Sequence, residues 1–308
     1  MKIRANGIDI EVEDTGADGS QNARPVVLLI MGLGMQLVAW PLPLVQALVD
    51  AGYRVIRHDN RDIGLSQHFD HLGTPNIVWV SLLHKMGFTP TAPYSLHDMA
   101  LDTVGVLDAL HIPQAHVVGA SMGGMIAQRL ALAAPERVAS LTSIMSSSGA
   151  RGLPQASAAV MWALLSRPVG PDREAMVSNG VKLFRVIGSP GFPMDEALLR
   201  ERIGVGFDRS WHPAGTLRQM VAIAADTDHR AALLGRIRQP TLVIHGKADA
   251  LVPYPNGEDT ARRIPGARMV GIEGMGHDLP PGVIARLLPE MLPFMAARAA
   301  NTGTASSA

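Results

Sequence analysis

The sequence predicts an α/β fold in which a mostly parallel central sheet is flanked by helices, with a helical cap insertion late in the chain. Three observations predict it. Short apolar runs that lack polar/apolar alternation recur between turn residues, as in strands that are buried on both faces. Segments of helical length separate these runs, and such an alternation indicates a parallel sheet. The alternation stops over residues 149–234, where the pattern is helical throughout.

The expected elements follow in order along the chain. Residues 8–13 alternate between apolar and polar and are expected to form part of an antiparallel edge of the sheet. Buried strands are expected at residues 26–31, 53–58, 116–119, 141–145, 241–245 and 268–272. Helices outside the insertion are expected at residues 43–51, 96–110, 122–134 and 282–299. The second of these helices has a start signal, because Asp98 follows Ser95 at the spacing of a capping box.

These elements divide the chain into a core and an insertion. We expect residues 1–148 and 235–300 to form the core, and residues 149–234 to form a helical cap, or lid, over one edge of the sheet. Residues 301–308 are small and polar, so the sequence predicts a disordered tail there.

The composition argues against several classes of protein. Lys+Arg and Asp+Glu are balanced at 27 each, whereas a nucleic-acid-binding protein usually carries a basic excess or patch. No apolar stretch approaches the ~20 residues of a membrane span, and the first residues do not resemble a signal peptide. The chain has no cysteine, which excludes disulfides, thiolate zinc sites and cysteine nucleophiles. We therefore expect a cytoplasmic protein, monomer or homodimer, that acts on a small molecule without a metal or other cofactor.

The strongest functional signal is a serine in the segment Gly119-Ala120-Ser121-Met122-Gly123, which matches G-x-S-x-G. A predicted strand runs into the motif and a predicted helix leaves it, which is the context that a nucleophile elbow needs. Side chains at positions 119 and 123 would clash where strand and helix approach. The alternative is a glycine-rich turn with an incidental serine, but a base and an acid follow at suitable places.

The candidate acid and base follow Ser121 in the order Ser, Asp, His that is typical of this type of hydrolase. Asp249 lies in the loop after the predicted strand 241–245, and His277 lies in the loop after 268–272. Both loops follow carboxyl ends of parallel strands, where α/β proteins bind their ligands. A turn-forming Asp and a surface His are the alternatives. The other loop that could carry the acid, residues 146–150, contains no carboxylate.

Backbone groups are expected to complete the site. The N–H groups of Met122 and Leu33 are the candidate oxyanion hole. Gly32-Leu33-Gly34 does not continue into a dinucleotide-binding pattern, because Leu37 stands where the third glycine would fall. We expect the Met122 side chain and Trp162, in the apolar segment 156–165, to bind substrate.

Other polar residues are expected to be structural. His245 borders a predicted strand, and Asp226, Asp228 and His229 are expected at the solvated surface rather than in a metal site.

Several segments together resemble the α/β-hydrolase superfamily over nearly the whole chain. They are residues 29–32, 59–66, 119–124 and 276–278, and they look most like the branch similar to aclacinomycin methylesterase. The resemblance implies a serine esterase whose nucleophile, acid and base are Ser121, Asp249 and His277, with Leu33 and Met122 as oxyanion donors.

The leading hypothesis is a serine hydrolase that cleaves small to medium, uncharged, largely apolar carboxylic esters through an acyl-enzyme. No cluster of Arg or Lys lies beside the nucleophile motif to bind a charged acyl group. Carbon–carbon bond hydrolysis, lactone or thioester hydrolysis and perhydrolysis by the same three residues stay open. A non-enzymatic receptor of this fold is the alternative from another class, although such a protein could have discarded members of the triad.

Overall fold

Eight strands form one sheet in the computed structural model, which describes residues 1–302 apart from 22, 167 and 171. The strand order is β1-β2-β4-β3-β5-β6-β7-β8. The strands are β1 (Lys2–Ala5), β2 (Ile8–Asp14), β3 (Val26–Ile30), β4 (Arg54–His58), β5 (Ala115–Ala120), β6 (Val138–Ile144), β7 (Thr241–Gly246) and β8 (Arg268–Ile272). β2 pairs antiparallel with β1 and β4, and the remaining neighbours are parallel. The predicted mostly parallel sheet with an antiparallel edge is confirmed, whereas β1 was not predicted.

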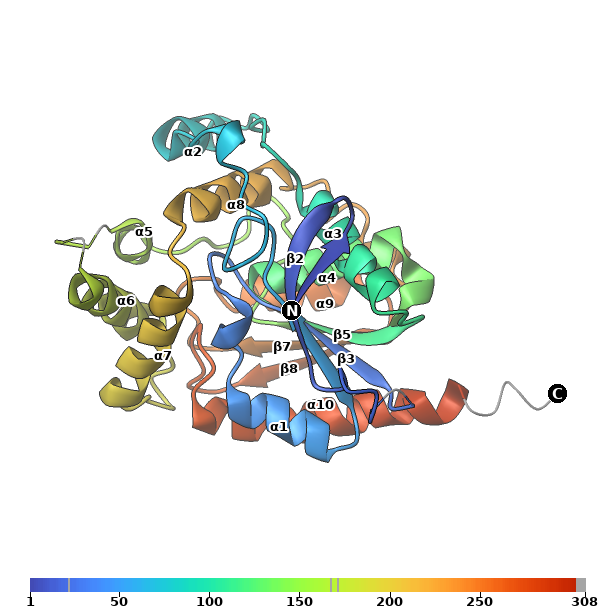
Figure 1. The fold of residues 1–308 in the computed structure, drawn as a ribbon. Coiled ribbons are helices and arrows are strands. Elements are labelled where there is room, and N and C mark those ends of the chain that lie inside the picture. Colours follow the sequence, from blue (N-terminus) through green and yellow to red (C-terminus); the bar gives the residue numbers. More distant parts are fainter. Residues whose placement is uncertain (22, 167, 171, 303–308) are drawn as a thin grey trace.

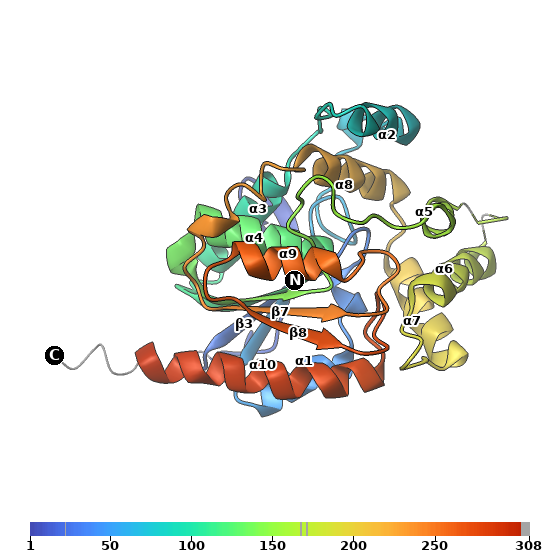
Figure 2. The ribbon, with the colours of Figure 1, turned by 180° about the vertical axis from the view of Figure 1, so that it is seen from behind.

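Helices cover both faces of this sheet (Figure 1 and Figure 2). One face is covered by α1 (Leu42–Asp50) and α10 (Pro281–Thr302), and the other by α3 (Leu96–Ala109), α4 (Met122–Ala133) and α9 (Pro255–Arg263). The capping box at the start of α3 is present, since Ser95 Oγ accepts from the Asp98 N–H and the Asp98 side chain accepts from the Ser95 N–H. α9 was not predicted, because its sequence PNGEDTARR has almost no apolar residues to reveal a helical period.

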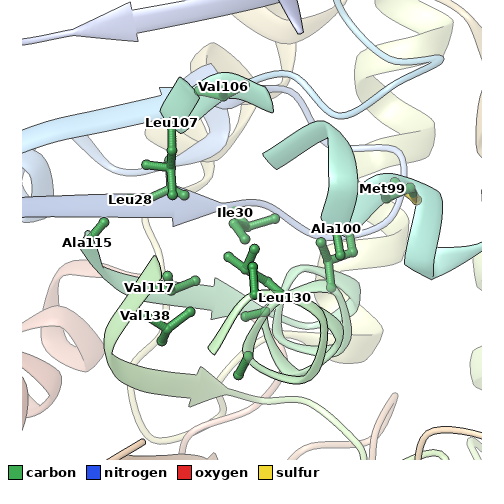
Figure 3. Packing of buried hydrophobic residues seen from close by; sticks show 14 of the residues in the cluster. Leu28, Ile30, Met99, Ala100, Val106, Leu107, Ala115, Val117, Leu130 and Val138 are labelled. Carbon is green, nitrogen blue, oxygen red and sulfur yellow. The ribbon is translucent and has the colours of Figure 1, made fainter. Parts of the chain in front are cut away.

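Side chains of β3 show why the buried strands lack alternation. Leu28 and Ile30 pack among residues of α3 and α4, as Figure 3 shows. Val27 and Leu29 point to the opposite face and pack against α1 and α10. Successive side chains of a strand point to opposite faces, so a strand that is covered by helices on both sides needs apolar residues at every position.

A second group of helices lies beyond the carboxyl ends of β7 and β8 (Figures 1 and 2). It contains α5 (Ala158–Leu165), α6 (Arg173–Ile187), α7 (Glu196–Arg209) and α8 (Pro213–Ala225). The described part of the segment predicted as a cap therefore contains four α-helices joined by turns and no strand, although its separation from the core as a domain stays a prediction. The unpredicted helix α2 (Ile77–Lys85) packs on α8.

The remaining features are short. The described residues also form 3₁₀ helices at Leu37–Ala39, Asp70–Leu72, Pro135–Arg137 and Leu234–Arg236. Of the predicted tail, Asn301 and Thr302 form the end of α10, and residues 303–308 lie outside the described residues. Within the described chain, no helix combines the length and the apolar character that crossing a membrane requires.

Candidate active site

Ser121 lies at the sharp turn between β5 and α4. Its backbone has φ 55° and ψ −122°, and residues with a side chain seldom have a positive φ. The Ser121 N–H donates to Ile144 O at 2.9 Å, and Ser146 Oγ donates to Ser121 O at 2.7 Å. These bonds to the end of β6 and the residues after it help to hold the strained backbone in place.

Two glycines allow strand and helix to approach each other at this turn. A Cβ at Gly119 would lie 2.6 Å from Gly124 N, and a Cβ at Gly123 would lie 2.6 Å from the carbonyl carbon of Ile30. Real Cβ atoms essentially never approach within 3.0 Å. The clash that the sequence analysis expected at both positions is therefore present in the structure.

The predicted acid and base meet Ser121 in one hydrogen-bonded chain, although they lie far from it in sequence. Ser121 Oγ lies 2.9 Å from His277 Nε2, and His277 Nδ1 lies 2.7 Å from Asp249 Oδ2. With the imidazole protonated on Nδ1, that nitrogen donates to Asp249 and Nε2 can accept the serine proton. The base and acid are almost completely buried, at 8% and 5% exposure.

The environment keeps Asp249 ionised. Burial by itself would raise the pKa of this carboxyl group, but the charge of His277 and hydrogen bonds from His277 and His245 outweigh burial and hold the pKa well below its usual range. The other oxygen, Oδ1, accepts from the N–H groups of Leu251 and Val252 at 2.9 and 2.8 Å. Such a carboxylate can orient and stabilise an imidazolium without taking its proton.

The loop that carries His277 is held by the linker between α6 and α7. The His277 N–H donates to Ile187 O at 2.7 Å. Ser189 Oγ accepts from the Gly276 N–H at 2.9 Å and donates to Asp278 Oδ1 at 2.5 Å. Sequence analysis missed Ser189, because only the tertiary fold brings this linker to the histidine loop.

The backbone of Leu33 and Met122 has the properties expected of an oxyanion hole. Both residues line the same cavity as Ser121. Met122 is the first residue of α4, so its N–H has no partner inside the helix. Among the described residues, neither N–H donates to a protein acceptor. Donors left free beside a nucleophile can stabilise the negative charge of a tetrahedral intermediate.

Ser121 and His277 open into a cavity of about 1070 Å³. This volume is at the upper end of the ~300–1,000 Å³ usual for small-molecule sites. The wall combines the oxyanion loop, the helical segment 149–234 and the inner side of α2, which sequence analysis did not predict. Met122 is fully buried in this wall, whereas Trp162 lines it while 81% exposed. Seven methionines contribute: Met31, Met35, Met122, Met125, Met145, Met161 and Met220.

Basic side chains also reach the cavity wall, and the sequence did not reveal them beside the nucleophile motif. They are Lys85, Arg151, Arg202 and Arg230. Arg151 pairs with Asp228 at 2.9 Å, and Arg230 pairs with Asp226. Arg202 donates to the carbonyls of Ala39 and Leu279 and pairs with no carboxylate in the part of the chain that the structure describes. The positive charges therefore come from distant segments, and two of the four, Arg151 and Arg230, are paired with carboxylates.

One expectation about surface residues is wrong. Asp226 is only 6% exposed and accepts hydrogen bonds from both Arg129 and Arg230, so it is part of a buried ion-pair cluster. Asp228 is half-exposed and pairs with Arg151, in line with a surface position.

A cluster of potential metal ligands lies elsewhere, at His68, Asp70 and His212. The two rings stack in parallel, with centroids 3.8 Å apart and an interplanar angle of 4°. Coordination by two imidazole nitrogens requires the ion to lie in the plane of each ring, and an ion cannot lie in two parallel stacked planes at once. The carboxylate of Asp70 is also already bonded, because Arg218 Nη2 lies 3.2 Å from its Oδ1. This arrangement does not fit a metal ion.

Comparison with known proteins identifies the family of the chain. The family model described as alpha/beta hydrolase fold matches residues 25–174, and the model described as TAP-like protein matches residues 220–282. Rhodomycin D methylesterase DauP of Streptomyces sp. (strain C5) is 35% identical over 82% of this chain and 85% of its own length. Rhodomycin D methylesterase DnrP of Streptomyces peucetius is 34% identical over the same shares, 82% and 85%.

Solved structures show the same fold at lower sequence identity. The enol-lactonase from Burkholderia xenovorans LB400 superposes with a TM-score of 0.71 at 21% identity, covering 96% of this chain and 100% of that one. At this identity the similarity concerns the fold alone. The chain belongs to the α/β-hydrolase fold family, in the branch that includes the rhodomycin D methylesterases.

Proposed function

We propose that the protein is a carboxylic-ester hydrolase in which Ser121 is the nucleophile, His277 the general base and Asp249 the acid that orients the base. The observation that carries the proposal is the hydrogen-bonded chain Ser121–His277–Asp249, of which Ser121 and His277 line a large cavity. Membership of a branch with two methylesterases supports ester hydrolysis as the reaction.

The reaction proceeds in two halves. His277 Nε2 takes the Ser121 proton as Oγ attacks the ester carbonyl, and the N–H groups of Leu33 and Met122 stabilise the oxyanion. The imidazolium then protonates the departing alcohol, which leaves an acyl-enzyme on Ser121. A water molecule gives a proton to His277 and attacks the acyl carbon. The proton returns to Ser121 Oγ as the carboxylic acid leaves.

The cavity indicates the kind of ester. Its lining is rich in methionines, which are flexible and adapt to bulky apolar ligands. Three of the four basic side chains already have acceptors in the protein, and the fourth, Lys85, is the last residue of α2. We therefore expect an uncharged, largely apolar acyl group. The names of the methylesterase relatives support a small alcohol such as methanol as the leaving group.

The test combines turnover with trapping of the nucleophile. The wild-type protein should hydrolyse a chromogenic ester, and a fluorophosphonate should add to Ser121, as peptide mass spectrometry would show. Ser121→Ala should lose both properties. Rapid labelling of a different residue, or ester turnover that survives in Ser121→Ala, would place the chemistry elsewhere. If the protein turned over no ester but cleaved a vinylogous diketone rapidly, the esterase assignment would be rejected. The roles of Ser121, His277 and Asp249 would still stand.

A further inference from the structure

We propose that His245 is a positioning residue for Asp249, so that the hydrogen-bonded chain at the active site has four members rather than three. This inference rests on the proposed function, because it concerns the same acid. Sequence analysis expected His245 to be structural, since it is the penultimate residue of a buried strand. Its position behind the acid gives it a second role.

His245 and the base both approach the carboxylate of Asp249. His245 Nε2 lies 3.5 Å from Asp249 Oδ2, the same oxygen that accepts from His277 Nδ1 at 2.7 Å. The same Nε2 lies 2.7 Å from Val252 O. Val252 is in turn tied to the acid, because its N–H donates to Asp249 Oδ1 at 2.8 Å. The ring of His245 therefore joins both ends of the loop that carries Asp249.

These contacts determine which nitrogen of His245 carries the hydrogen. Val252 O and the carboxylate of Asp249 can only accept, so Nε2 must carry a hydrogen and donate. Nδ1 is buried and has no hydrogen-bond partner among the described residues. A Cβ at Gly257 would lie 2.5 Å from this Nδ1, so the backbone of α9 packs directly against it. A hydrogen on Nδ1 would be buried without an acceptor, which favours the tautomer with hydrogen on Nε2.

A neutral N–H donor at this place suits the reaction. When His277 becomes an imidazolium, Asp249 must keep its charge and its orientation. The Nε2–H of His245 binds Val252 O, and Nε2 lies 3.5 Å from Asp249 Oδ2. The ring therefore holds the acid's loop and presents the positive end of an N–H dipole near the carboxylate, as an outer partner does for a ligand that must be held in place. The groups that face this carboxylate are His277, His245 and two backbone N–H groups, and the ring of Tyr254 packs edge-on against His245.

The test uses two amide variants that differ in the position of their N–H groups. His245→Gln can place an amide nitrogen near the position of Nε2, whereas the shorter side chain of His245→Asn reaches only the position of Nδ1. His116→Asn is the matched control, because His116 is also buried in a central strand and its Nδ1 lies 2.8 Å from Ser140 Oγ, with no contact to the proposed triad among the described residues. Thermal unfolding of all three variants separates lost stability from lost positioning.

We expect His245→Asn to lower kcat about 10- to 100-fold with KM changed by less than about twofold, because the Nε2–H that binds Val252 O and lies close to the carboxylate of Asp249 is lost. His245→Gln should recover most of this loss, and His116→Asn should lower stability without lowering kcat.

A second measurement needs no substrate. The proton between His277 Nδ1 and Asp249 should give a downfield proton NMR signal, because the bond is short and involves a charged acceptor. We expect this signal to broaden by exchange with water in His245→Asn and to sharpen again in His245→Gln.

Two results would overturn the inference. One is an unchanged NMR signal and kcat in His245→Asn. The other is an equal loss in His245→Gln, His245→Asn and His116→Asn, which would show that His245 only packs. Failure of the proposed function is distinguishable, because it would remove ester turnover and Ser121 labelling from the wild-type protein and leave the NMR comparison intact.

Discussion

Replacement of Asp249 by Asn tests the proposed mechanism most sharply, because the structure predicts how the new amide would orient. The Asn oxygen has to take the place of Oδ1, since the N–H groups of Leu251 and Val252 can only donate. The Asn NH₂ group then faces His277 Nδ1. An imidazole can change tautomer, whereas a backbone amide cannot, so Nδ1 becomes the acceptor and the hydrogen moves to Nε2.

This tautomer disables the base. Nε2–H would point at Ser121 Oγ, which lies 2.9 Å away in the wild-type protein, and could not accept the serine proton. We expect kcat to fall by up to ~10⁴, equivalent to about 5 kcal/mol of activation free energy, with the fold kept because the side chain has nearly the same size.

The assay is steady-state hydrolysis of a chromogenic ester at pH 7, with denaturant unfolding to confirm the fold. Asp208→Asn is the matched control, because Asp208 is half-exposed and pairs with Arg173 away from the site. Its kcat should stay within about twofold of the wild-type value. A folded Asp249→Asn protein that keeps more than a tenth of the wild-type kcat would refute the assignment of the acid.

Four further outcomes are expected. Ser121→Ala should lower ester hydrolysis by about 10⁴ or more and leave the unfolding transition in place; activity above a tenth of wild type would contradict the nucleophile assignment. Gly123→Ala should destabilise the protein by at least about 3 kcal/mol in denaturant titrations, because the new Cβ would overlap β3. Gly235→Ala is the control and should change stability little, because its Cβ would meet its nearest neighbour at 3.8 Å. Equal effects of the two substitutions would refute the steric argument. Across p-nitrophenyl esters from acetate to laurate, kcat/KM should rise by up to about fourfold per buried methylene, equivalent to ~0.8 kcal/mol, and then fall. A preference for a hemi-ester with a free carboxylate would contradict the expected uncharged acyl group. Burial lowers the pKa of His58 from 6.5 to about 4, so as pH falls the imidazole binds a proton in the unfolded chain before it does so in the folded protein. The free energy of unfolding should therefore decline between pH 6.5 and pH 4, by roughly 3 kcal/mol from this group. His58→Leu should flatten that part of the curve of stability against pH.

Local patterns explain how much of the fold was predictable. Every parallel strand and every predicted helix outside the insertion is present within a few residues of its expected position. Their burial on both faces leaves an unbroken apolar run that can be recognised without a partner. β1, α2 and α9 were missed. β1 and α9 are short and mostly polar, and α2 has the sequence IVWVSLLHK, which gives no clear helical period.

The residues of the candidate site also fall into those that local sequence patterns predict and those that they do not. Ser121 was recognisable because a nucleophile elbow is a local strand–turn–helix structure with required glycines. Asp249 and His277 were recognisable from their order and from their places after strands. Ser189, His245 and Arg202 could not be assigned, because nothing within a few residues of them distinguishes them from ordinary cap, strand and helix residues.

The sequence by itself therefore determined the fold class, the order of the strands along the chain and the three residues of the proposed triad. Each depends on the type and spacing of neighbouring residues. Only the tertiary structure decided that α2 joins the cavity wall, that the α6–α7 linker holds the His277 loop and that His245 stands behind Asp249. Hydrogen bonds and packing act over a few ångströms in space, and they join groups that the sequence keeps far apart.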